Sequence, residues 1–309
     1  MNSAVIKGFS LAILAAVFWG ISGTFGQFLF QSRGIDVTWL ITVRMLVSGS
    51  LLLLLARFGE KADVFTVWRN RKDAIRLLIF SITGMLAVQY TYFAAIKHSN
   101  AATATVLQYF GPIIIAGFLA VKHKRLPRLH EAFAILLAVT GTFLLVTHGN
   151  FHTLAISGMA LFLGLASAVA LAVYTLQPKV LLLKYKPTVV IGWGMFCGGI
   201  AISFVKAPWS TAGVWDVYTY LSTAMIVIFG TLIAFTFYLY AVKIIGGQKA
   251  SLLASAEPLA AAILAVYWLK TPFTLMDWAG SFCIISTVFL LSKSGQRTKP
   301  ADPTGAVVM

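Results

Sequence analysis

The chain reads FSITGMLAVQYTYFAAIKHSNAATATVLQYFGP at residues 80–112 and IVIFGTLIAFTFYLYAVKIIGGQKASLLASAEP at residues 226–258. When the two stretches are aligned at an offset of 146, nine of the 33 positions are identical, including Tyr92 with Tyr238 and Pro112 with Pro258. An apolar composition produces some identities by chance, but it does not produce a shared spacing of tyrosine, lysine and proline. We therefore interpret the chain as two copies of one unit.

The chain as a whole is too apolar for a soluble protein. Of its 309 residues, 59% are hydrophobic and 11% are charged, whereas a soluble domain is about 45–50% apolar and about 25% charged. The net charge is +15, but the cations are spread between apolar runs, which excludes a nucleic-acid-binding face. Cys197 and Cys283 lack the spaced partners of a metal or redox motif, so the sequence predicts no metal and no cofactor.

Ten apolar runs are long enough to cross a bilayer, because a hydrocarbon core of about 30 Å requires about 20 helical residues. The runs cover residues 8–30, 38–56, 75–96, 101–121, 130–147, 157–178, 188–205, 219–242, 249–269 and 276–292. The sequence therefore predicts an all-α polytopic membrane protein with ten transmembrane helices.

Lysine and arginine residues are distributed unevenly between the two sides of these runs. Nineteen lie on one side, and Arg44 lies inside the second run. The opposite side has only Arg33, Lys97, Lys206 and Lys270. Because loops rich in lysine and arginine stay in the cytoplasm, we expect a multi-pass protein of the cell (plasma or inner) membrane with both termini cytoplasmic.

Five spans in each copy is an odd number, so the second copy is expected to cross the membrane in the opposite direction. Lys97 then lies outside while its counterpart Lys243 lies inside. We predict a first five-helix repeat at residues 1–147, an inverted repeat at 148–292 and a disordered cytoplasmic tail at 293–309. Inverted repeats around a central cavity are typical of secondary transporters, which work by alternating access.

Short motifs in a fixed order make the chain similar to a known family. The motifs are Phe18-Trp19-Gly20, Arg44-Met45-Leu46-Val47-Ser48, Tyr92-Phe93-Ala94-Ala95-Ile96, Pro112, Glu257-Pro258 and Asp277-Trp278-Ala279-Gly280. Over residues 8–292 the chain resembles the drug/metabolite transporter superfamily, in particular the EamA-type permeases. It departs from the family at Lys124 and Lys270, where members often carry glutamate.

The resemblance implies a basket of ten helices around a central cavity lined mainly by helices 1, 3, 4, 6, 8 and 9. It also implies transport of small metabolites, and export of amino acids or related amines is the activity that we expect from it. The resemblance does not name the substrate, because the superfamily also transports sugar phosphates and nucleotide sugars.

Glu257 is the only carboxylate deep in a predicted span. An ionisable group at that depth is costly and usually faces a cavity or a partner. It is therefore a candidate for binding a substrate ammonium or for taking up a proton. The alternative is a structural glutamate packed beside Pro258.

Arg44 lies near the outer end of the second predicted span. A long cationic side chain at such a position can reach the interface with its charged end. We therefore expect a structural cation, in preference to a clamp for a substrate carboxylate.

Pro112 and Pro258 occupy equivalent positions in the two copies. Each removes a backbone donor inside a predicted helix, and paired helix breaks mark the binding region of many transporters. They are candidate hinges, with kinks required only for packing as the alternative.

Aromatic and amide side chains are further candidates for the cavity wall. Gln89 and Tyr92 share one face of the third span, and Tyr238 repeats Tyr92 in the eighth. The other candidates in predicted spans are Trp19, Tyr109 and Tyr174. Such a wall suits cation–π contact with an ammonium group, although aromatic residues are also ordinary helix packing.

The sequence has no nucleotide-binding loop and no motif of a hydrolase or metalloprotease. We therefore expect a transporter and not an enzyme, driven by a gradient of an ion or a substrate. The expected partners are a small-molecule substrate and membrane lipid, with the proton as candidate coupling ion and no nucleic acid. The alternatives are an uptake permease for a cationic or aromatic solute and, from another class, an intramembrane enzyme or lipid-handling scaffold.

Overall fold

The computed structural model describes residues 3–122, 124, 129–148, 155–245, 250 and 253–294. The elements in these ranges are helices joined by short connections, and no strand occurs among them. Three segments, named η1 to η3, are π-helices that continue an α-helix.

The helices of the first part of the chain are α1 (Ser3–Ser32), α2 (Val37–Leu54), η1 (Leu55–Gly59), α3 (Thr66–Arg69), α4 (Arg71–Ile79), η2 (Phe80–Leu86), α5 (Ala87–His98), α6 (Ala101–Gln108), α7 (Gly111–Lys122) and α8 (Leu129–Thr147). Those of the second part are α9 (Gly158–Leu176), α10 (Lys179–Lys184), α11 (Pro187–Ser203), α12 (Val217–Ala224), η3 (Met225–Ile233), α13 (Ala234–Ile245), α15 (Ala256–Tyr267) and α16 (Leu275–Ser294).

Six of the helical stretches in the described ranges are long and apolar enough to cross a membrane, and three shorter apolar helices accompany them. This confirms the predicted all-α polytopic membrane protein, while the count of ten crossings stays a prediction. The helices begin and end within a few residues of the predicted runs. Most of the predicted tail at 293–309 lies outside the described residues, and 293–294 continue α16.

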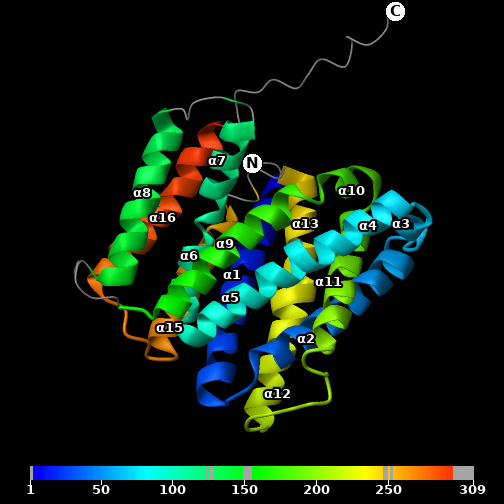
Figure 1. The fold of residues 1–309 in the computed structure, drawn as a ribbon, viewed down its shortest axis with the longest axis horizontal. Helices are drawn as coiled ribbons and strands as arrows, with labels where there is room; N and C mark the ends of the chain where they lie inside the picture. The colour runs from blue at the N-terminus through cyan, green and yellow to red at the C-terminus, as the bar shows by residue number, and fades with distance from the viewer. Residues whose placement is uncertain are drawn as a thin grey trace, which may run out of the picture.

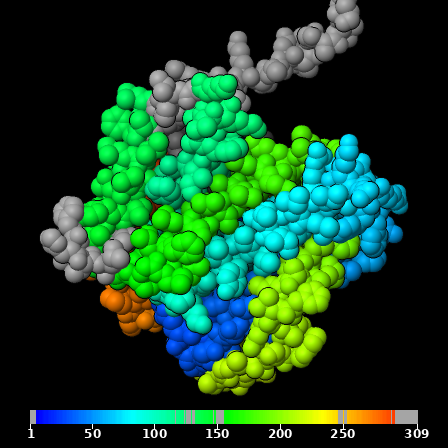
Figure 2. Space-filling model, in the orientation of Figure 1, coloured from blue at the N-terminus to red at the C-terminus, as the bar shows by residue number. Residues whose placement is uncertain are grey.

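Two long helices at the centre of the bundle come one from each part of the chain. The stretch α4–η2–α5 packs between α9 and α11 (Figures 1 and 2). The stretch α12–η3–α13 packs in turn against α1, and η3 also contacts α2. Each part of the chain therefore contributes one long helix that packs against the other part.

Two helix pairs flank this centre. Helices α8 and α16 pack together on the left of Figure 1, and α2 packs along α11. The first pair approaches closely at two glycines, because a Cβ atom at Gly141 would lie 2.6 Å from the Gly280 carbonyl oxygen. A larger residue at either glycine would force the two helices apart.

The largest buried cluster lies between α1, α2, α5 and α11. It contains Leu29, Met45, Phe80 and Phe93, each no more than 1% exposed. Many outward-facing side chains are apolar as well, such as Phe58, Phe162 and Phe282. Such a surface is expected where lipid and not water surrounds the helices.

The π-helical segments η2 and η3 lie at the start of the two stretches of sequence that repeat at an offset of 146, with η3 beginning one residue earlier. At the end of η2 the Ala87 amide donates to Ile82 O, and at the end of η3 the Ala234 amide donates to Phe229 O. Each of these bonds spans five residues instead of four. Segments of π-helix are rare and occur frequently at functional sites.

Helix α1 begins and α16 ends at the same end of the molecule, at the top of Figure 1. We call this end the α1 end and the other the α12 end. The distribution of cations in the sequence predicts that the α1 end is cytoplasmic.

Candidate functional site

Two of the long apolar stretches are broken directly before a proline. Helix α6 ends at Gln108, and α7 begins at Gly111 with Pro112 as its second residue. In the second part of the chain, Ser255 precedes α15, of which Pro258 is the third residue. Proline is tolerated in the first turn of a helix because the amide there has no helical partner. The predicted breaks are thus present at both prolines.

The two breaks meet at Tyr109 and Glu257. The Tyr109 hydroxyl lies 2.6 Å from the Ala254 carbonyl oxygen and 3.3 Å from Glu257 Oε2. Its single proton serves the nearer oxygen better, so Tyr109 satisfies the carboxylate only weakly. Glu257 is therefore a partly buried acceptor that can take a further donor.

Tyr92 belongs to the same interior, but its hydroxyl is occupied. The Tyr92 hydroxyl lies 2.7 Å from Thr105 Oγ1, and Thr105 donates its own proton to Ala101 O at 2.7 Å. Tyr92 is therefore the donor in this pair. A Cβ atom at Gly23 would lie 2.6 Å from the Tyr92 hydroxyl, so only glycine lets α1 approach so closely.

The rings of Trp19 and Tyr238 lie together, as parts of α1 and α13. Their centroids are 5.3 Å apart, and the Trp19 ring is also 5.3 Å from Phe235. The three rings form an aromatic group that we call the Trp19 cluster. Gly20, next to Trp19, packs directly on α15, since a Cβ atom there would lie 2.7 Å from the Glu257 carbonyl oxygen, which relates the cluster to the second helix break.

Gln89 is buried, with 7% of its surface exposed. Its Nε2 lies 3.6 Å from Met85 Sδ, while its Oε1 has no hydrogen-bond partner in the described part of the chain. An unpaired buried acceptor costs about 1–3 kcal/mol. A ligand or a water molecule with a donor would remove this cost.

Tyr174 of α9 packs against the first part of the chain. Its ring stacks on Phe80 of η2, with centroids 5.7 Å apart. It lies one helical turn before Gln177, toward the centre of the bundle from the α1 end.

Arg44 does not reach the interface as expected, because it is only 6% exposed. Its Nε donates to Thr231 Oγ1 at 2.7 Å, and its Nη2 donates to Gly230 O at 3.3 Å. Its guanidinium lies 4.8 Å from the centre of the Phe93 ring. The partners are 186 and 187 residues away in the sequence, so they fix the arginine in the interior.

Arg44 and Glu257 interact electrostatically with each other, and Arg44 also interacts with Tyr92. The interior therefore contains one cation and one carboxylate near the helix breaks. The sequence singles out both residues but does not relate them to each other. The signal that could have done so is an arginine in an apolar run together with the polar Thr231 inside the repeat.

The described residues show no group of three His, Cys, Asp or Glu side chains that could hold a metal ion. The groups around Glu257 that the structure brings together are a cation, phenols and aromatic rings. Their chemistry suits reversible binding of a small polar or charged molecule.

The chain is similar in sequence to known membrane transporters. A profile of the EamA-like transporter family matches residues 6–147 and again residues 158–293. The chain is 41% identical to the uncharacterized inner membrane transporter YicL of Salmonella typhimurium (strain LT2) over 291 residues, which cover 94% of this chain and 97% of YicL. It is 25% identical to the uncharacterized transporter YwfM of Bacillus subtilis (strain 168), over 94% of this chain and 95% of YwfM.

A crystal structure of a protein with 18% sequence identity has the same fold. It superimposes with a TM-score of 0.62 and covers 96% of this chain and 99% of that one.

Proposed function

Because the chain belongs to the EamA-like transporter family, we propose that this membrane transporter exports amino acids or related amines by alternating access. The main support for the proposal is the position of Glu257. Its carboxylate lies where two helix breaks meet, and Tyr109 satisfies it only weakly. An ammonium group with several donors would complete its hydrogen bonding.

The Trp19 cluster supports the same class of substrate. Aromatic rings attract cations with about 0.5–2 kcal/mol, more where water is excluded. Trp19 and Tyr238 offer such rings on α1 and α13, two helices that pack against each other. A primary amine bound at Glu257 would find both charge and ring faces in this interior.

The balance of charge favours an amino acid over a multiply charged metabolite. When Glu257 is ionised, as it would be with an ammonium bound, it and Arg44 carry opposite charges. Their charges cancel, so a zwitterion or a single cation enters at a lower electrostatic cost than a sugar phosphate with two negative charges.

Alternating access is supported by the arrangement of the irregular helices. The breaks at Pro112 and Pro258 and the segments η2 and η3 lie in the two copies of the repeat. Helices that depart from regular geometry absorb conformational change with less cost than regular ones. Each copy therefore contains one π-helical segment and one helix break at which it can change conformation.

A matched set of ligands tests the substrate class on the purified protein. We expect an amino acid and the amine that lacks its carboxylate to raise the melting temperature, and the N-acetyl derivative to leave it unchanged. A ligand that binds only the folded state at 100 times its Kd stabilises it by about 2.7 kcal/mol. Equal stabilisation by the N-acetyl derivative would contradict recognition of the ammonium.

The direction of transport needs vesicles of known orientation. We expect counterflow of the stabilising amino acid in both directions and, with a proton gradient imposed, net movement toward the side of the α12 end. Net movement toward the α1 end would favour the alternative of an uptake permease. Chemical conversion of the ligand, followed by mass spectrometry, would favour the alternative of an intramembrane enzyme.

A further inference from the structure

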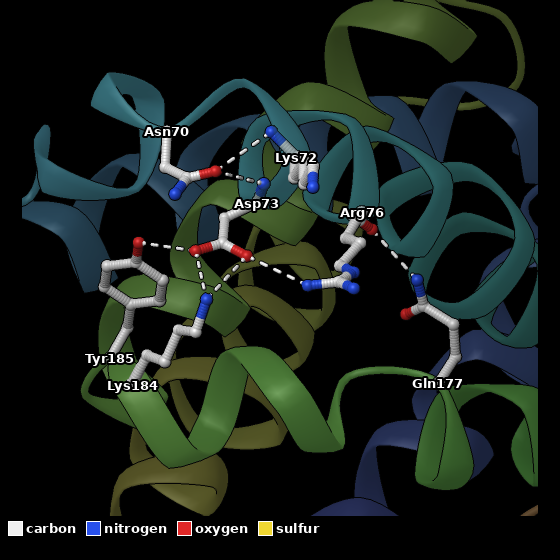
Figure 3. A network of polar contacts seen from close by, with 7 residues as sticks. All are labelled: Asn70, Lys72, Asp73, Arg76, Gln177, Lys184 and Tyr185. Atoms are coloured by element: carbon white, nitrogen blue, oxygen red, sulfur yellow. Dashed lines mark hydrogen bonds and ion pairs between the residues drawn. The ribbon is translucent and has the colours of Figure 1, made fainter.

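A buried carboxylate at the α1 end links the two parts of the chain (Figure 3). Asp73 of α4 accepts hydrogen bonds from Lys184 Nζ at 2.8 and 3.1 Å and from the Tyr185 hydroxyl at 3.0 Å. Arg76 donates to it from the next turn of α4 at 3.2 Å. The Asp73 side chain is 1% exposed. We call these four residues the Asp73 clasp.

Two donors of the Asp73 clasp, Lys184 and Tyr185, are adjacent in the sequence. Burial and the hydrogen bond to Asp73 raise the pKa of Tyr185, so its hydroxyl remains a donor at neutral pH. Lys184 ends α10, and Tyr185 follows it in the connection to α11. The clasp therefore joins the start of α4 to the connection between α9 and α11.

A second pair lies at the α12 end. Arg33 Nη2 is 3.1 Å from Asp216 Oδ2, and the Val214 amide donates to Arg33 O at 2.9 Å. The Thr219 amide and the Arg33 guanidinium lower the pKa of Asp216 below its usual value. We call Arg33 and Asp216 the Asp216 clasp. It joins the start of α12 to the connection between α1 and α2.

The two clasps lie at helix starts whose capping residues are equivalent in the repeat. Asn70 caps α4 by accepting from the Lys72 and Asp73 amides, and Asp216 caps α12 by accepting from the Thr219 amide. Residues 70 and 216 differ by 146, which is the offset of the repeat. Each clasp thus fastens the start of one long central helix to a connection in the other part of the chain.

A second layer lies behind the Asp73 clasp. Gln177 Nε2 donates to Arg76 O at 2.9 Å, as Figure 3 shows. One turn further into the bundle on each helix, the rings of Tyr174 and Phe80 stack. At this end α4–η2 and α9 are therefore held together by a polar layer and then by an aromatic layer.

We propose that the two clasps are the gates of the transport cycle, and that Asp73, Lys184, Arg33 and Asp216 are its positioning residues. The Asp73 clasp closes the α1 end and the Asp216 clasp closes the α12 end. Both are formed in this structure. The proposal rests on the alternating access proposed above, because each open state requires one clasp to break while the other holds.

The two clasps differ in strength. Arg33 and Asp216 are 25% and 37% exposed, and exposed ion pairs contribute little. Asp73 is buried with three donor side chains, and a buried carboxylate that loses its partners is strongly disfavoured. The α12 end is therefore expected to open more often than the α1 end when no substrate is bound.

A buried reporter cysteine tests the gates without any transport assay. Ala170 is 6% exposed and lies one turn from Tyr174 on the same side of α9. The reporter Ala170→Cys is placed in a background with Cys197→Ala and Cys283→Ala. A membrane-impermeant maleimide is then applied from each side, in vesicles of opposite orientation.

We expect Asp73→Asn and Lys184→Met to increase labelling from the α1 end several-fold and to decrease labelling from the α12 end. Asp216→Asn should have the opposite effect, because asparagine preserves the helix cap while removing the charge. Lys184→Arg should retain the original pattern. Lys179→Met, at the exposed start of the same short helix α10, is the matched control and should also retain it.

Unchanged labelling in the Asp73 and Lys184 variants, in protein that remains monodisperse, overturns the proposal. If Asp73→Asn does not fold, Tyr185→Phe removes one hydroxyl from the clasp and should shift the labelling in the same direction. If the clasp variants shift the labelling but the vesicles transport no amino acid, the proposed function is refuted and the proposed gates are supported. If the vesicles transport an amino acid but no clasp variant alters the labelling, the gates are refuted and the proposed function is not.

Discussion

At the scale of single residues, the interior contains two opposite charges in different environments. Arg44 is held by two hydrogen bonds to η3 and by the Phe93 ring, whereas Glu257 is held only weakly by Tyr109. A group with fixed partners suits a structural role, and a group with spare acceptor capacity suits a ligand. Glu257 is thus the stronger candidate for substrate binding, and Arg44 for fixing η3.

Replacing Glu257 with glutamine tests its role with almost no change in volume. The variant should fold normally and bind the amino acid about 10-fold to 100-fold more weakly, because a hydrogen bond to a charged group contributes about 1.5–3 kcal/mol. Removing a buried charge should leave the melting temperature equal or higher. The measurement is the ligand-induced thermal shift together with counterflow in vesicles at several pH values. Unaltered binding and an unaltered pH profile would assign Glu257 to structure.

Thr231→Val tests whether Arg44 fixes η3. Thr231 is fully buried, accepts from Arg44 Nε and donates to Ile226 O at 2.8 Å. Its loss leaves the buried Arg44 Nε donor unpaired, so we expect destabilisation of about 1–3 kcal/mol. Thr223→Val is the control, because Thr223 makes an ordinary bond to Thr219 O one turn earlier in α12. Equal melting temperatures for Thr231→Val and Thr223→Val would contradict the role of Arg44 in fixing η3.

At the scale of helices, irregular geometry is concentrated in equivalent elements of the two repeats. The π-helical segments lie in the long central helices, and the breaks lie before Pro112 and Pro258. The sequence predicted the breaks because proline lacks an amide hydrogen. It did not predict the π-helices, because an apolar run fits both hydrogen-bonding patterns.

Pro112→Ala and Pro258→Ala test the breaks as hinges. Alanine restores the amide and favours a continuous helix, while a first-turn position makes the effect on stability small, about 1 kcal/mol or less. We expect folded, membrane-inserted protein that binds its ligand with unchanged affinity and transports it several-fold more slowly. The measurement is the exchange rate in vesicles beside the thermal shift. Wild-type rates in both variants would reduce the prolines to packing kinks.

At the scale of the whole molecule, the two ends of the described chain lie together at the α1 end (Figure 1). Glu60, in the connection after η1, lies near the same end, since its carboxylate accepts from Thr188 at the start of α11. Ser210 lies in the connection between α11 and α12, toward the opposite end. The charge distribution predicts which end faces the cytoplasm.

Reporter fusions test this orientation. Fusions at Glu60 and Arg125 should read cytoplasmic, and fusions at Asn150 and Ser210 should read external, because cationic loops are retained inside. Arg125 and Asn150 lie outside the described residues, so the fusions also test the topology there. The measurement is the activity of a reporter that is active on one side of the membrane only. The reverse pattern would refute both the charge distribution and the inverted repeat.

The sequence alone determined the membrane-spanning helices, the helix breaks and the choice of Glu257. These features depend on local chemistry: a bilayer requires apolar runs of a given length, proline removes a backbone donor, and a lone carboxylate in an apolar run is conspicuous. The motifs in their order also indicated the family, which the comparisons confirm.

Only the tertiary structure decided which distant groups meet. Asp73 binds a lysine 111 residues away, Arg44 binds a threonine 187 residues away, and Tyr109 meets Glu257 over 148 residues. For the same reason Tyr174 proved to stack on Phe80 beneath the Asp73 clasp. Hydropathy and spacing describe each helix along its own axis, whereas these contacts depend on how helices from the two parts of the chain pack side by side.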